Sequence, residues 1–82
     1  MPASPFLEAV GRRIALVRER RGLTQAQLAH AIGVSKATVA HFEHGRASFN
    51  VGRLFAIADA LHCRPDVLLE PDRPMPRSRS DD

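Results

Sequence analysis

The segment LTQAQLAHAIGVSKATVAHFEHG, which spans Leu23–Gly45, decides the fold of this chain. Thr24 and Gln27 have the spacing of a capping box, so we expect a helix to begin there and to end at Gly33. Ser35 is suited to cap a second helix, which the last glycine of the segment ends. A three-residue connection that begins with glycine cannot set two helices antiparallel. The segment therefore predicts two short helices that meet at a steep angle.

The sequence on both sides of this segment also predicts helices. Pro5 is suited to the first helical position, and apolar residues at three- and four-residue spacing continue until Gly22. Asn50 is a good cap for a fourth helix, and residues 64–69 predict a short fifth one. The apolar residues that the five helices carry are Leu7, Val10, Ile14, Val17, Leu28, Ala29, Ile32, Val39, Phe42, Val51, Leu54, Phe55, Ile57, Ala58, Leu61, Val67, Leu68 and Leu69.

Length and composition agree with one small all-α domain. The 82 residues leave room for little more, and four aromatic residues without an alternating β-branched run argue against strands. From residue 71 the chain consists mainly of Pro, Arg, Ser and Asp, which cannot bury enough surface to offset the entropy of ordering. We therefore expect a compact five-helix domain over residues 1–70 and a disordered tail over residues 71–82.

Several protein classes are excluded by simple counts. No apolar stretch approaches the roughly 20 residues that a membrane-spanning helix needs. The absence of a leader sequence argues against secretion, and the single Cys63 excludes a disulfide framework, so a cytoplasmic protein is expected. Residues 1–64 hold nine Lys and Arg against four acids, a net charge of +5 that favours a polyanion such as nucleic acid.

The pattern resembles the lambda-repressor-like, or xenobiotic-response-element (Cro/C1-type), family of helix-turn-helix proteins. The resemblance covers about residues 7–70 and implies a DNA-binding domain whose recognition helix enters the major groove while the preceding helix braces against phosphates. The residues that carry it are Arg18, Arg21, Gly22, Leu23, Thr24, Gln25, Leu28, Ala29, Gly33, Val34, Ser35, Val39, Phe42, Glu43, Gly45, Leu54, Ile57, Ala58, Ala60, Leu61, Leu68 and Leu69.

The resemblance implies four base-contacting positions, which are Lys36, Ala37, Thr38 and His41. Lysine donates to guanine O6 and N7, threonine offers a hydroxyl or a methyl group, and alanine makes only an apolar contact, such as one to a thymine methyl. The alternative is an ordinary exposed helix face, which carries polar residues whatever it contacts.

The resemblance also implies contacts with the DNA backbone. Gln25 stands in the first turn of a helix, where backbone N–H groups also favour an anion. The alternative is a capping role like that of Gln27, or plain solvation. Arg46 follows Gly45 and precedes the next helix N-terminus, so a cation and several donors meet there. The full set of expected phosphate ligands is Gln25, Ser35, His44, Arg46, Ser48 and Asn50.

Two residues far apart in the sequence, Arg18 and Glu43, match an ion pair of the family that links the first helix to the third. A bidentate ion pair, in which two guanidinium nitrogens bind the carboxylate, would fix the angle of the recognition helix. His41 and His44 also have metal-ligand spacing, but no partners complete a tetrahedron, so neither a metal nor any other cofactor is expected.

Three departures from the family fall where its members often dimerise: Phe49 in place of proline, His62 in place of glycine and Arg64 in place of a serine cap. An αL cap at His62 is therefore expected to be either absent or strained. The expected dimer interface comprises Leu61, His62, Arg64, Pro65 and Leu68.

These expectations favour a sequence-specific, DNA-binding transcriptional regulator, most simply a repressor. It would bind double-stranded DNA at a palindromic operator as a homodimer, associated with the nucleoid. The alternative is an antitoxin-like or accessory regulator that chiefly binds a partner protein through its tail and uses DNA binding for autoregulation. No glycine-rich phosphate loop or Ser-His-acid set is present, so no enzyme activity is expected.

Overall fold

The computed structural model describes residues 5–47 and 50–69, and all five expected helices lie within these ranges. No strand occurs in either range, so the all-α fold is confirmed. The predictions for Ser48, Phe49 and the tail at residues 71–82 lie outside the described residues. The helices are α1 (Pro5–Arg20), α2 (Gln25–Ile32), α3 (Lys36–Glu43), α4 (Val51–Ala60) and α5 (Pro65–Leu69).

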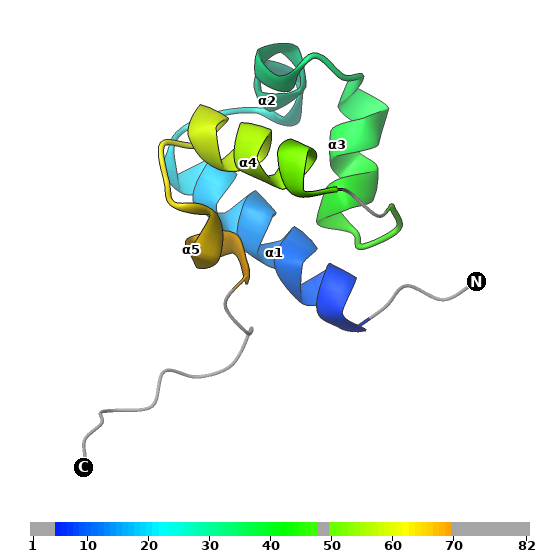
Figure 1. The fold of residues 1–82 in the computed structure, drawn as a ribbon. Coiled ribbons are helices and arrows are strands. Elements are labelled where there is room, and N and C mark those ends of the chain that lie inside the picture. The colour runs from blue at the N-terminus through cyan, green and yellow to red at the C-terminus, as the bar shows by residue number, and fades with distance from the viewer. Residues whose placement is uncertain (1–4, 48–49, 70–82) are drawn as a thin grey trace.

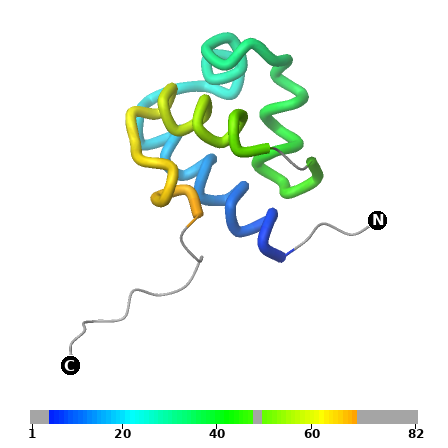
Figure 2. The backbone as a smooth tube through the Cα atoms, in the orientation of Figure 1, coloured from blue at the N-terminus to red at the C-terminus, as the bar shows by residue number. Residues whose placement is uncertain are grey.

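The turn between α2 and α3 has the caps that the sequence predicts. The Thr24 hydroxyl accepts from the Gln27 amide at 3.0 Å, and the Gln27 side chain accepts from the Thr24 amide at 2.8 Å. Gly33 ends α2 with a φ of 76°, and the Ser35 hydroxyl accepts from the Thr38 amide at 3.1 Å. Figure 1 shows α2 nearly end-on beside the length of α3, and Figure 2 shows the sharp turn between them. The two helices therefore cross steeply, as expected.

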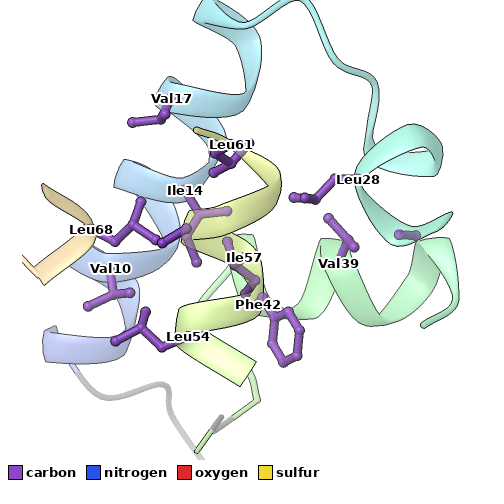
Figure 3. Close-up of a cluster of buried hydrophobic side chains, with 12 residues drawn as sticks. Val10, Ile14, Val17, Leu28, Val39, Phe42, Leu54, Ile57, Leu61 and Leu68 are labelled. Atoms are coloured by element: carbon purple, nitrogen blue, oxygen red, sulfur yellow. The ribbon is translucent and has the colours of Figure 1, made fainter. Parts of the chain in front are cut away.

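All five helices contribute to one core (Figure 3). α3 packs against both α1 and α2, while α4 packs against α2 and α5. Two apolar residues of α4 stay outside, because Val51 is 69% and Phe55 is 57% exposed. The buried apolar residues are Val10, Ile14, Val17, Leu28, Ala29, Val39, Phe42, Leu54, Ile57, Ala58, Leu61 and Leu68.

This core corrects part of the expected dimer interface. The side chains of Leu61 and Leu68 are 0% exposed, because they fill the space between α1, α4 and α5. Side chains enclosed in this way cannot touch a second copy, so the prediction is wrong for these two leucines. His62 and Arg64 are exposed and Pro65 is half-buried, so these three residues stay accessible.

The first helix approaches the end of α3 so closely that only glycine fits at two positions. A Cβ atom on Gly11 would lie 2.4 Å from the carbonyl oxygen of Phe42 and 2.5 Å from that of Glu43. A Cβ atom on Gly45 would lie 2.7 Å from the Glu8 backbone, and Gly45 also has a φ of 70°. Backbone therefore packs on backbone here, which fixes the position of the C-terminal end of α3.

The turn after α4 adopts a backbone conformation that usually requires glycine. His62 has a φ of 55° and is the one described non-glycine residue with a positive φ, so the expected strain is present. The Arg21 guanidinium donates to the carbonyl oxygens of Leu61 at 2.8 Å and His62 at 3.1 Å. A cation at the C-terminal end of a helix is favourable, so Arg21 offsets part of the cost of this turn.

Candidate nucleic-acid interface

One side of α3 faces away from the rest of the protein and carries the expected base-contacting residues. Lys36, Ala37 and His41 are exposed, whereas Val39 on the opposite side is fully buried. Thr38 is half-buried, and its hydroxyl lies 2.9 Å from that of Ser35. The outward side of α3 thus offers an ammonium, an imidazole and a methyl group to a ligand.

A buried charged cluster holds α3 against α1. Arg18 and Glu43 are each 9% exposed, and the guanidinium binds the carboxylate through Nε at 2.6 Å and Nη2 at 3.3 Å. The expected bidentate ion pair is therefore present. Arg18 also donates from Nη1 to the carbonyl oxygen of Leu23 at 2.7 Å, which ties the α1–α2 turn into the same cluster. Such a paired geometry keeps both charges satisfied away from water.

Gln25 joins this cluster from the first turn of α2. Its amide nitrogen donates to Glu43 Oε1 at 2.9 Å, so the N-terminus of α2 is linked to the C-terminal end of α3. Gln25 is half-buried and an amide nitrogen carries two hydrogens, which leaves one N–H for a ligand. The residue can thus support α3 and donate to an anion at the same time.

The segment between α3 and α4 places further polar groups at the surface. Arg46 is exposed directly after the close contact at Gly45. Asn50 caps α4 through its side-chain oxygen, which accepts from the Arg53 amide at 2.7 Å and leaves the side-chain NH₂ group directed elsewhere. His44 is exposed at the end of α3, and its ring nitrogen Nδ1 lies 2.9 Å from the carbonyl oxygen of Ala40.

A groove runs between α1 and the end of α3, beside the buried cluster. Its volume is about 480 Å³, and basic, acidic and apolar side chains line it. We call it the His44 groove. Its lining residues are Arg12, Arg13, Ala15, Leu16, Glu19, Glu43 and His44.

Metal binding, a reactive thiol and a membrane span find little support in the described part of the chain. No group of three or more His, Cys, Asp or Glu side chains there could hold a metal ion. Burial raises the pKa of the Cys63 thiol, while the nearby Arg21 lowers it and Asp66 raises it further. Cys63 packs beside the core as a neutral thiol at pH 7. None of the described helices has the length and hydropathy of a membrane span.

Three residues that position the site were not singled out in the sequence for this role. Gly11 permits the contact with α3, Arg21 holds the turn after α4, and Arg53 donates to the carbonyl oxygen of Ile32 at 3.2 Å at the end of α2. A glycine inside an otherwise helical apolar pattern was the one available signal, because it often marks a close packing contact. The two arginine contacts join residues 21 or more positions apart and leave no local pattern.

Comparison with known proteins gives a consistent result. A model of a helix-turn-helix family, HTH_3, matches residues 14–68. The chain is 34% identical over 65 residues to the repressor protein C2 of Salmonella phage P22, covering 79% of this chain and 30% of that protein. It is 41% identical over 61 residues to an uncharacterized HTH-type transcriptional regulator, y4aM, of Sinorhizobium fredii, covering 74% of this chain and 43% of that one.

Among solved structures, the P22 c2 repressor in complex with a synthetic operator superposes with a TM-score of 0.70 at 35% identity. The match covers 77% of this chain and 96% of that one. The chain therefore spans less than half the length of the two curated relatives above, while it matches nearly all of the operator-bound chain.

Proposed function

This chain belongs to the helix-turn-helix family, and from that premise we propose that it is a sequence-specific DNA-binding transcriptional regulator, most simply a repressor. The observation that carries the proposal is the two-sided recognition helix. Its inner side is fixed by the core and by the Arg18–Glu43 pair, and its outer side is exposed. The operator complex of a relative at 35% identity supports DNA as the ligand. No catalytic step is part of this proposal.

In the proposed complex, α3 lies in the major groove. Lys36 and His41 contact base edges, Ala37 makes an apolar contact, and Thr38 contacts a base through its methyl group or hydroxyl. Residues of α2, of the two ends of α3 and of the segment before α4 bind backbone phosphates around this helix. The proposed phosphate ligands are Gln25, Ser35, His44, Arg46, Ser48 and Asn50, of which Ser48 lies outside the described residues.

We propose a homodimer as the functional unit, because one short recognition helix contacts only a few base pairs. The surface around the end of α4 is the place where two copies would meet. Phe55 is 57% exposed beside a groove of about 500 Å³ that reaches Pro65, and Val51 lies one turn before it. His62 and Arg64 are exposed, and in the sequence they flank Cys63, which lines the same groove. In this arrangement Leu61 and Leu68 support the interface from inside the core.

The alternative role, in which the protein chiefly binds a partner through its tail, rests on residues 71–82. These residues lie outside the described part of the chain, so this role stays a prediction. The DNA-binding role would place the protein with the nucleoid in the cytoplasm.

The proposal is tested by selecting bound duplexes from a random pool with the full chain. We expect enrichment of two short sequence elements related by a two-fold axis, with centres about 34 Å apart or a multiple of that distance. Binding should weaken steeply as salt is raised, because phosphate contacts release counterions. A pool that stays unenriched through repeated rounds would contradict the proposal, and a single unpaired element would contradict the dimer alone.

A further inference from the structure

The His44 side chain is held in one tautomer by its own helix. Its Nδ1 lies 2.9 Å from the carbonyl oxygen of Ala40, which can only accept, so Nδ1 must carry the hydrogen and donate it. In the neutral ring Nε2 then has a lone pair and no hydrogen. The ring nitrogen that is not bonded to Ala40, Nε2, is therefore an acceptor when the ring is neutral and a charged donor when the ring is protonated.

His44 lies on the side of α3 that we propose to face DNA. It follows Ala37 by seven residues, which is two helical turns, so the two residues share one side of the helix. It also lines the His44 groove, into which α1 contributes Arg12 and Arg13. An anion that enters this groove would meet the imidazole and the two arginines, beside the carboxylates of Glu19 and Glu43. The DNA backbone supplies such an anion at every nucleotide.

We propose that the His44 groove binds a DNA backbone phosphate only with a protonated His44, so that DNA binding takes up a proton. This inference rests on the proposed function. A phosphodiester oxygen has no hydrogen to donate, so a neutral Nε2 facing it would set two acceptors against each other. Protonation replaces that contact with a charge-assisted hydrogen bond. The bound state therefore favours the imidazolium.

The sign of the pH dependence follows from this preference. Because the complex favours the protonated ring, DNA affinity rises as the pH falls. The charged groups that line the groove together with His44 are Arg12, Arg13 and Glu19 of α1 and Glu43 of α3. The carboxylate of Glu43 is already paired with Arg18.

The test measures the affinity of the full chain for its selected duplex and for a scrambled duplex at pH 6 and pH 8. One charge-assisted hydrogen bond predicts an affinity about tenfold higher at pH 6 for each bound protomer. Because the contact is with the backbone, the ratio should be the same for both duplexes. The slope of log affinity against log salt should also be steeper at pH 6 by about 0.9 for each protomer.

Variants of exposed histidines separate this contact from the others. The His44→Asn variant should lose the pH dependence of the salt slope, and the His44→Arg variant should bind at pH 8 as tightly as the unchanged protein binds at pH 6. His30→Gln, a matched change on α2, should leave both ratios unaltered. His41→Asn should alter binding to the selected duplex alone, because His41 is proposed to contact a base.

Two results would overturn the inference while leaving the proposed function intact. One is an unchanged pH ratio and salt slope in His44→Asn. The other is a His44-dependent affinity that rises with pH on the selected duplex, since a neutral Nε2 would then accept from a base. The proposed function fails in a different way, by equal binding of the two duplexes at both pH values.

Discussion

The two sides of α3 differ in almost every physical respect. The inner side ends in Glu43, a buried carboxylate that receives three hydrogen bonds from two other helices. The outer side carries Lys36 and His41, whose exposed side chains make no hydrogen bond to the described part of the chain. The inner side fixes the direction of the helix, and the outer side is left for a ligand. Changes on the inner side should therefore act on stability, and changes on the outer side on DNA binding.

The largest effect is expected for Glu43→Ala, which removes the buried partner of Arg18 and leaves that charge with the exposed carboxylate of Glu19, 3.6 Å away. Removal of one partner of a buried pair costs about 3–5 kcal/mol in the free energy of unfolding. Chemical denaturation followed by circular dichroism measures this loss. The double variant Arg18→Met/Glu43→Leu is the matched control, because replacing both charges by apolar groups is often close to neutral. A single variant as stable as the unchanged chain would show that the cluster does not hold α3.

A smaller but still clear loss is expected for Gly11→Ala. The added Cβ atom would meet two backbone carbonyl oxygens at the end of α3, and neither can turn away as a side chain does. Overpacking of this kind costs about 1–3 kcal/mol. The control is Gly52→Ala on the outer part of α4, where the nearest atom to an added Cβ lies 3.4 Å away. Equal stability of the two variants would contradict the close contact between α1 and α3.

On the outer side, Lys36→Ala and Arg46→Ala should separate the contacts with bases from those with the backbone. Loss of Lys36 should cost about 1–3 kcal/mol of discrimination between the selected and a mismatched base pair. Loss of Arg46 should weaken binding to all duplexes alike and lower the salt slope by about 1. Both residues are exposed, so thermal unfolding should change little. Uniform weakening by both variants would contradict the assignment of roles.

The smallest effect is a gain of stability for His62→Gly. Glycine adopts a positive φ without the steric cost that the histidine bears, so the variant should be more stable by roughly 1 kcal/mol. Thermal unfolding of the two proteins under the same conditions measures the gain. A lower unfolding temperature in the variant would show that the histidine side chain stabilises the turn more than its backbone conformation costs.

Local features of the fold were predictable from the sequence, whereas contacts between distant residues were not. The caps at Thr24, Ser35 and Asn50 depend on residues three positions away, so their patterns are complete within a short window. The pairing of Arg18 with Glu43 was predicted from the family resemblance and not from spacing, since 25 positions separate them. The contact at Gly11 depends on a distant backbone and was missed.

The error at Leu61 and Leu68 has a similar cause. An apolar residue near a helix end is equally compatible with a core and with an interface between copies, and the pattern of one helix does not distinguish the two. The short α5 folds back onto α1 and α4, and this tertiary contact encloses both leucines. The base-contacting and phosphate-contacting roles of individual residues stay predictions.

The central claim, that the outer side of α3 contacts base edges, is tested most directly by one comparative titration. Fluorescence anisotropy of the unchanged full chain is measured against its selected duplex and against a scrambled duplex of equal length and composition, at one fixed salt concentration. Base contacts predict an affinity for the selected duplex that is higher by about a thousandfold or more. Indistinguishable affinities for the two duplexes would contradict the claim and leave only a general attraction to polyanions.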